Sequence, residues 1–176
     1  MLAALNESGL DPQRLEIEIT EGVVLDQSSG SLATMRRLRS YGIRVALDDF
    51  GTGYSSLSYL VELPVDKIKI DQSFIRGLLE RKQSEAIVDA ILGLAKKLDL
   101  TVTAEGVETA GQAMTLASRR CDQIQGYLIG KPRPADDVPA VLRSAPEALR
   151  QAMPVGQSSP LALALVMKKH SERREA

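Results

Sequence analysis

Two adjacent aspartates, Asp48 and Asp49, end an apolar segment and lead into a loop that contains Gly51 and Gly53. Carboxylates side by side repel each other, so in a cleft of low dielectric constant they need a cation to stay ionised. Carboxylate oxygens are the ligands that Mg2+ and Mn2+ prefer. The pair therefore indicates a divalent metal site, and the glycines allow backbone shapes in the loop that other residues resist.

Further chemically active side chains occur where other alternating segments end. They are Glu18, Lys69, Glu105 and Gln125, with Glu21 and Glu108 close by. With the two aspartates they amount to six carboxylates and one lysine, a cluster that needs cations to be stable. The only histidine, His170, lies in a polar tail and is expected to be solvated. The chemistry is therefore expected to use metal-activated water.

Short alternating segments and longer helical patterns follow one another along the chain. Strands are predicted at 15–20, 43–49, 65–71, 101–105 and 122–128. Helices are predicted at 29–42, with serines for an N-cap and Gly42 for a C-cap, at 84–100, and at 109–120, with Thr109 as the cap. The second helix has apolar residues at helical spacing, at Ile87, Ile91, Leu94 and Leu98. This alternation predicts a parallel sheet built from βα units.

Residues at alternate strand positions face opposite sides of a sheet, and here one side is apolar and the other polar. The apolar set is Leu15, Ile17, Ile19, Ile43, Val45, Leu47, Ile68, Ile70, Val102, Ala104, Ile124 and Leu128. The polar set is Glu16, Glu18, Thr20, Arg44, Ala46, Asp48, Lys67, Lys69, Asp71, Thr101, Thr103, Glu105, Gln123, Gln125 and Tyr127. Parallel sheets are normally covered on both faces, so the pattern favours a (βα) barrel with a polar interior over a sheet with one solvated side. In such a barrel the site lies at the carboxyl ends of the strands.

Composition is typical of one soluble globular domain. The chain has 176 residues, of which 44% are hydrophobic, and a formal charge of −1. This balance gives no electrostatic basis for binding DNA, and no apolar run approaches the ~20 residues of a membrane span. The single cysteine, Cys121, excludes an internal disulfide and is expected to be buried as a small apolar residue. We expect a cytoplasmic protein.

Five segments occur in order, each at a predicted strand end: EITE at 18–21, DDFGTG at 48–53, KID at 69–71, AEGVE at 104–108 and QGYLIGKPRP at 125–134. Together they resemble the EAL domain, a bacterial family that hydrolyses cyclic di-GMP. The resemblance implies an α/β fold, a TIM-like barrel of eight strands, of which about five are present here. It also implies metal-dependent hydrolysis of cyclic di-GMP to linear pGpG by a two-metal mechanism with Mg2+ or Mn2+.

The resemblance also implies a role for each matching residue. The metal ligands would be Glu18, Asp48, Asp49 and Glu105, and the catalytic residues Lys69, Glu105 and Gln125, with Lys69 holding or deprotonating the attacking water. Glu21 would hold the loop that carries Gly51 and Gly53, and Glu108 would be a structural support. Simpler interpretations stay open: Asp48 and Asp49 as a turn or helix cap, Lys69 as a partner of Glu18 or Asp48, and Gln125 as a partner of buried backbone.

The chain departs from the family at its beginning. The Glu-Ala-Leu signature does not occur on an early strand, nor does the asparagine expected on the next one, and both would be metal ligands. Residues 1–144 are expected to be the C-terminal part of an EAL domain and 145–176 a flexible tail, with a helix near 147–153. Three explanations are open: a true start upstream, a remnant of a disrupted gene, or a reduced module that pairs with another chain.

These departures leave a second function open. A truncated, inactive EAL module would bind cyclic di-GMP or a protein partner without turnover. A homodimer and an upstream regulatory domain outside this chain are also compatible with the sequence. A third possibility is a chain that does not fold on its own.

Overall fold

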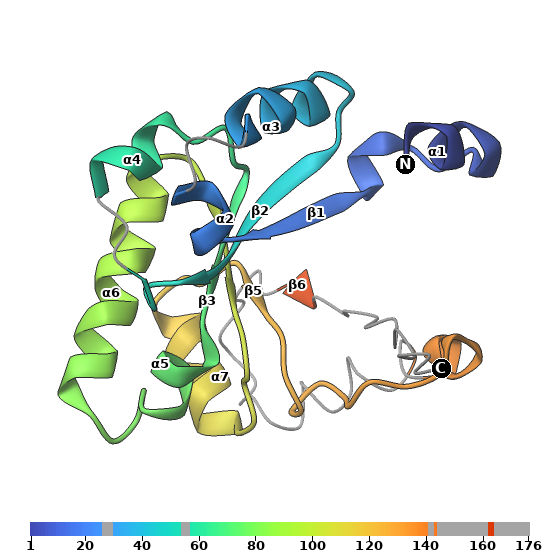
Figure 1. Cartoon of the computed structure of the whole chain (residues 1–176). Helices are drawn as coiled ribbons and strands as arrows, with labels where there is room; N and C mark the ends of the chain where they lie inside the picture. The colour runs from blue at the N-terminus through green and yellow to red at the C-terminus, as the bar shows by residue number, and fades with distance from the viewer. Residues whose placement is uncertain (26–29, 54–56, 141–142, 144–161, 164–176) are drawn as a thin grey trace, which may run out of the picture.

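Six parallel strands form the sheet, and their order in space is their order in the chain (Figure 1). The computed structural model describes residues 1–25, 30–53, 57–140, 143 and 162–163. The strands are β1 Glu16–Thr20, β2 Arg44–Phe50, β3 Lys67–Ile70, β4 Thr101–Ala104, β5 Gln123–Ile124 and β6 Ala162–Leu163. The predicted parallel sheet is confirmed, and β6 adds a pairing to β5 that the sequence patterns did not predict.

Helices connect the strands. They are α1 Leu2–Ser8, α2 Glu21–Leu25, α3 Ser31–Ser40, α4 Leu57–Glu62, α5 Gln72–Arg76, α6 Lys82–Lys97 and α7 Ala110–Ser118, with the short 3-10 helices η1 Pro12–Arg14 and η3 Ala135–Asp137. The helices that follow β2, β3 and β4 lie on the left-hand side of the sheet in Figure 1. Within the described ranges no helix is long and apolar enough to cross a membrane. The helix predicted at 147–153 and His170 lie outside the described residues.

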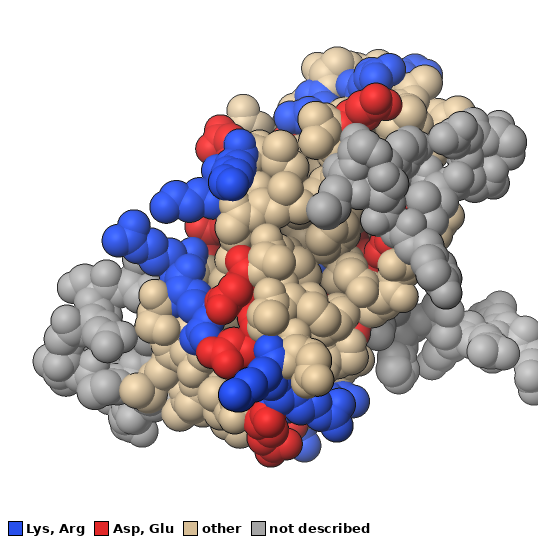
Figure 2. All heavy atoms as spheres, turned by 90° about the vertical axis from the view of Figure 1, so that its left-hand side faces the viewer, with Lys and Arg blue, Asp and Glu red and all other residues tan. Residues whose placement is uncertain are grey.

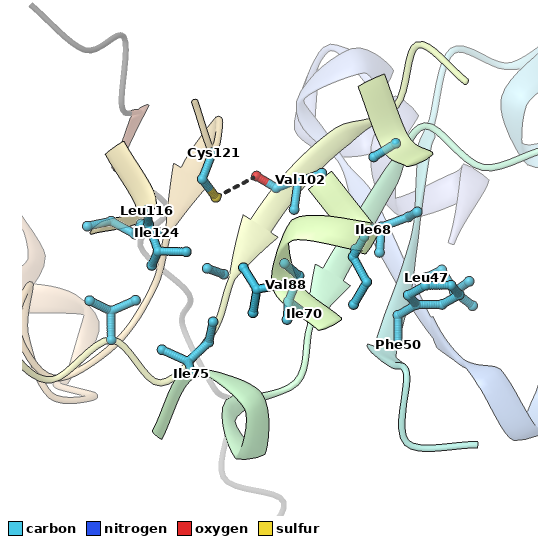
Figure 3. Packing of buried hydrophobic residues seen from close by; sticks show 14 of the residues in the cluster. Leu47, Phe50, Ile68, Ile70, Ile75, Val88, Val102, Leu116, Cys121 and Ile124 are labelled. Carbon is cyan, nitrogen blue, oxygen red and sulfur yellow. Dashed lines mark hydrogen bonds between the residues drawn. The ribbon is translucent and has the colours of Figure 1, made fainter. Parts of the chain in front are cut away.

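The apolar strand face forms the core against these helices (Figure 3). Leu47, Ile68, Ile70 and Val102 are each at most 2% exposed, as the alternation predicts. Each such side chain contributes about 1.5–3 kcal/mol when it is fully buried. Cys121 is buried in the same cluster, and burial raises the pKa of its thiol to about 12. Its predicted role as a small apolar residue is confirmed.

The fifth strand is shorter than predicted, because Gly126 turns the chain against Val107. A Cβ on Gly126 would lie 2.2 Å from the carbonyl oxygen of Val107, so only glycine allows the two backbones to approach this closely. The amide of Ile129 donates to the carbonyl of Gly126 (3.0 Å) and closes a turn. The prediction that the strand continues to Leu128 was therefore wrong.

The observed helix ends agree in part with the caps predicted from the sequence. The predicted serine N-cap of α3 was wrong, because Gly30 (φ 64°) occupies that position without a side-chain hydrogen bond. The C-cap of the same helix is Tyr41, and the predicted Gly42 (φ 84°) follows one residue later, where its amide donates to Arg39 O (2.8 Å). Thr109 caps α7 as predicted, in a capping box whose other member is Gln112.

The predicted buried face of α6 is confirmed at Ile91, Leu94 and Leu98, which belong to the core cluster or pack against it, but not at Ile87. Ile87 is 37% exposed, whereas its neighbour Val88 is fully buried, together with Ile91 and Ala95. Adjacent branched apolar residues give the same periodicity to within one position, so the pattern alone could not choose between them.

Charged side chains of both signs cover the outer helical side of the molecule. Figure 2 shows them interleaved, and neither sign forms a broad patch on the described part of this face. One cluster links α7 to α6, where Arg119 pairs with Glu85 and with Asp89 (2.7 Å). Exposed ion pairs of this kind contribute about 0–1 kcal/mol each, so the apolar core holds this side of the fold together.

Two aspartates tie neighbouring strands together at their amino ends. Asp122 precedes β5 and accepts the amide of Val102 on β4 (2.8 Å), just as Asp66 precedes β3 and accepts the amide of Val45 on β2 (2.9 Å).

We expect Asp122→Ala to lower the free energy of unfolding by about 1–3 kcal/mol, because the buried amide of Val102 loses its acceptor. Urea unfolding measures this, with the exposed Asp136→Ala as the control. Equal midpoints for the two variants would contradict the prediction.

Candidate metal centre

Four strands bring their polar ends together around Lys69. The Nζ atom of Lys69 on β3 lies 2.7 Å from Glu18 Oε1 on β1, 2.9 Å from Asp48 Oδ1 on β2 and 2.7 Å from Glu105 Oε1 just after β4. The lysine side chain is 5% exposed, and those of the three carboxylates are 36%, 20% and 16% exposed in the same order. The polar strand face of the sequence thus becomes one cluster at the carboxyl end of the sheet.

The charge of Lys69 is stabilised by this arrangement. Burial alone would lower the pKa of Lys69, but the contacts with Glu105, Glu18 and Asp48 outweigh it and raise the pKa. The metal-free site therefore favours the charged form of Lys69, which can donate hydrogen bonds to a water molecule. One layer deeper, Lys67 pairs with a single carboxylate, Glu16 (2.7 Å).

Asp49 joins Asp48 because the strand is irregular there. Its φ of 56° is left-handed, a conformation that Asp tolerates better than most residues. The pairing register between β2 and β3 also shifts between Leu47 and Phe50. One oxygen each from Asp48, Asp49 and Glu105 then lie within 4.8 Å of one another. Neighbouring strand residues, which would otherwise face opposite sides, thus reach the same site.

Two of these carboxyl groups hold their protons more tightly than usual. Burial and the charge of Asp48 raise the pKa of Asp49. Burial also raises the pKa of Glu105, against the lowering effect of Lys69. Three carboxylates near one lysine leave an excess of negative charge, which a bound cation would relieve.

The donor set fits hard divalent cations. All three clustered ligand atoms are carboxylate oxygens, which Mg2+ and Mn2+ prefer. Among the described residues, the buried atoms Asp48 Oδ1 and Gln125 Oε1 have no hydrogen-bond partner, although the former makes the ion pair with Lys69. Buried polar atoms normally have such partners, so Gln125 Oε1 is available to a metal ion or to water, whereas Asp48 Oδ1 already contacts Lys69 Nζ.

Glu21 anchors the loop after the aspartates. Its side chain is almost fully buried, and Oε2 accepts the amides of Gly51 (3.4 Å) and Gly53 (3.3 Å). A Cβ on Gly53 would lie 2.6 Å from Glu21 Oε1, so this close approach requires glycine. Gly51 has a φ of 97°, which also favours glycine.

The remaining sequence-predicted residues lie at the edges of this cluster. The backbone of Gln125 pairs with Ala104 and Val107, which places its side chain beside the Glu105 segment. Glu108 is exposed, and within the described part of the chain its carboxylate makes no hydrogen bond or ion pair. Sequence reasoning missed Gln112, a buried side chain that accepts the amide of Glu108 (2.9 Å). Its position three residues after Thr109 is a capping-box signal that could have found it.

We expect Mn2+ to raise the melting temperature more at pH 8 than at pH 5. Asp49 and Glu105 have raised pKa values in the folded chain, so their metal-free contribution to stability is present in acid and is lost as the pH rises through those values. Metal ligands must be deprotonated, so the ion contributes most where the protons have left. Differential scanning calorimetry with and without Mn2+ measures both shifts, with Asp137→Asn as the control. A shift that is the same at both pH values would contradict this.

The chain matches the EAL domain family over residues 1–132. It is 41% identical, over 80% of its length, to the cyclic di-GMP phosphodiesterase NbdA of Pseudomonas aeruginosa, of which it covers 18%. The curated relatives that it matches are much longer, and it spans about a fifth of their length or less. The triplet Glu147–Leu149 in the tail does read Glu-Ala-Leu, but it lies beyond the matched residues and outside the described ones.

Solved structures agree with this match. The PaMucR phosphodiesterase in complex with cyclic di-GMP has a TM-score of 0.74 and 41% identity, over 78% of this chain and 56% of that one. Klebsiella pneumoniae BlrP1, solved with manganese and cyclic di-GMP, has a TM-score of 0.67 and 36% identity, over 72% of this chain and 32% of that one. The described sheet and helices are thus part of a TIM-like barrel, as predicted. The chain belongs to the EAL domain family, which includes cyclic di-GMP phosphodiesterases.

Proposed function

We propose that this chain carries the C-terminal part of a metal-dependent phosphodiesterase that hydrolyses cyclic di-GMP to linear pGpG. The observation that supports it best is the convergence of Glu18, Asp48 and Glu105 on Lys69, with Asp49 turned toward the same place. An excess of carboxylates beside one buried lysine suits a site that binds two Mg2+ or Mn2+ ions and a phosphodiester.

Each residue has a distinct task in this proposal. Glu18, Asp48, Asp49 and Glu105 hold the metal ions, which when bound activate water and neutralise charge that develops on the phosphate. Lys69, protonated and fixed by three carboxylates, orients the attacking water.

The other predicted residues support that site. Gln125 presents its buried carbonyl oxygen to the water or the metal. Glu21 holds the loop of Gly51 and Gly53 in place, so that the loop covers the site. Glu108 contributes to the support of the segment that carries Glu105 through its backbone amide, which donates to Gln112.

A second candidate function is binding of cyclic di-GMP or of a protein partner without turnover. It is favoured by the strands β1–β6 themselves, because none of them contains the Glu-Ala-Leu or asparagine ligands that the family resemblance implies. Losing metal ligands reduces hydrolysis more than it reduces binding of the substrate. A homodimer, a regulatory domain outside this chain and a cytoplasmic location complete the proposal.

Incubation of the purified chain with cyclic di-GMP and Mn2+ or Mg2+ tests the first function. Chromatography should show pGpG, and EDTA should stop its formation. If no pGpG forms while calorimetry detects cyclic di-GMP binding, and this binding survives Asp48→Asn, the second function holds. If neither product nor binding is found, both are wrong. Light scattering after size exclusion measures whether the chain dimerises.

A further inference from the structure

The short helix α5 lies between the two segments that carry the candidate ligands. It follows β3, and thus Lys69, directly, and Asp71 caps it by accepting the amide of Ser73 (3.0 Å). On one side, the ring of Phe74 packs against the Asp48–Asp49 loop: a Cβ on Gly51 would lie 3.0 Å from Phe74 Cε2. The loop thus has two contacts that fix it, the ring of Phe74 and the carboxylate of Glu21, which accepts its amides.

The other side of α5 contacts the segment that follows Glu105. A Cβ on Gly106 would lie 2.6 Å from Gln72 Cβ, so the backbone here packs directly on the first residue of α5. Gln112 then joins the same segment to α5. Its Nε2 donates to Ile75 O (3.1 Å), and its Oε1 accepts the amides of Glu108 (2.9 Å) and Thr109 (3.0 Å).

The carboxamide of Gln112 is thus a buried crosslink. The residue is 7% exposed, and both ends of its amide are used. A non-polar replacement would remove the acceptor of the part-buried amides of Glu108 and Thr109 and also the buried hydrogen bond to Ile75 O. Within the described residues, no hydrogen bond joins Gln112 to a candidate ligand, so it acts through the elements that it joins.

We infer that α5 is a spacer that sets the position of the Asp48–Asp49 loop relative to Glu105, and that Gln112 is a positioning residue that fixes this spacer. The chain of contacts runs from Glu108 through Gln112 and Ile75 to Phe74 and Gly51. Loss of the hydrogen bonds of Gln112 should therefore increase the mobility of the Asp48–Asp49 loop, to which Gln112 makes no hydrogen bond. Only the consequence for metal binding rests on the proposed function.

Amide hydrogen exchange of the metal-free chain tests the inference. Gln112→Met keeps the length of the side chain and removes both hydrogen-bonding ends. It should speed exchange at Val107 and also at Gly53 about tenfold, the effect of losing one buried hydrogen bond. Gln112→Glu keeps the acceptor for Glu108 and Thr109 but loses the donor to Ile75 O. It should match Gln112→Met at Gly53 and the wild type at Thr109.

Two further variants make the test specific. Thr109→Ala removes the opposite half of the capping box and leaves the link to Ile75, so it should speed exchange at the start of α7 and leave Gly53 unchanged. Phe74→Leu removes ring contact with Gly51 and should speed exchange at Gly53 alone, which keeps the inference testable if Gln112→Met does not fold. Unchanged exchange at Gly53 in Gln112→Met or in Phe74→Leu overturns the inference, as does an equal increase at Gly53 in Thr109→Ala.

Calorimetric titration with Mn2+ gives the functional consequence. We expect Gln112→Met and Gln112→Glu to bind Mn2+ about tenfold more weakly than the wild type, since changes in the residues that support metal ligands cost about 10–100-fold. Thr109→Ala should bind as the wild type does. A wild-type chain that binds no Mn2+ would contradict the proposed function, whereas the exchange results would still decide the role of Gln112 and α5.

Discussion

Replacing Asp48 by asparagine is expected to remove metal binding and, with it, formation of pGpG. Asn keeps the size of the side chain and one carbonyl oxygen but removes the negative charge. Substitution of residues that only support metal ligands already lowers metal affinity about 10–100-fold. Loss of a ligand charge should therefore lower Mn2+ affinity by more than about 100-fold. Calorimetry measures the affinity, and chromatography of pGpG measures the activity.

The folded state should tolerate this change. Asp48 is one of three carboxylates around Lys69, so Asp48→Asn leaves two partners for the lysine and removes one charge that repels Asp49. Lost affinity would then not reflect unfolding. Asp137→Asn, an exposed carboxylate in η3, is the matched control. Mn2+ affinity within threefold of wild type in Asp48→Asn would contradict the assignment of this residue as a ligand.

Replacing Lys69 by methionine should have the largest effect on the metal-free fold. It removes the cation that Glu18, Asp48 and Glu105 share, and leaves their charges facing one another. Breaking a buried ion pair from one side costs about 3–5 kcal/mol, and we expect about 3 kcal/mol because Glu18 is partly exposed. Urea unfolding without metal measures the loss. The loss should shrink in acid, because protonated carboxyl groups no longer repel one another.

Mn2+ should restore much of the stability of Lys69→Met, because a divalent cation replaces the missing charge. Lys67→Met is the matched control, since Lys67 pairs with one carboxylate, Glu16, away from the clustered ligands. Lys67→Met should lose less stability, and Mn2+ should stabilise it no more than it stabilises the wild type. Equal losses in the two variants, or equal rescue by the ion, would show that the cluster around Lys69 is an ordinary ion pair.

Strand periodicity predicted the main part of the site. Glu18, Asp48, Lys69 and Glu105 occupy positions of the polar face at or just beyond the strand ends, and parallel strands place those ends at one edge of the sheet. That they converge follows from the sequence, and the structure adds the contacts. The roles that the family resemblance assigns to all of these residues stay predictions, as do those of Gln125, Glu21 and Glu108, although the contacts of Glu21 with the loop amides suit its role.

Tertiary contacts decided what the sequence could not. The early end of β5 depends on the backbone of Val107, which lies against Gly126 although the two residues are separated in the sequence. The choice of Val88 over Ile87 for the core depends on how α6 sits on the sheet. The capping-box pattern could have found Gln112, but not its bond to Ile75, which comes from another element. Local patterns contain none of this information.

The left-handed backbone of Asp49 ties ligand geometry to loop position. A side-chain rotation moves a carboxylate by a few ångströms, but a return of this residue to ordinary strand geometry would move its carboxylate to the opposite face of the sheet, toward the core. The same rotation would redirect the chain at Gly51 and draw the loop away from Glu21. Under the proposed function, one backbone torsion of Asp49 therefore sets both the position of a metal ligand and the position of the loop, so a ligand that displaces the loop would also weaken metal binding.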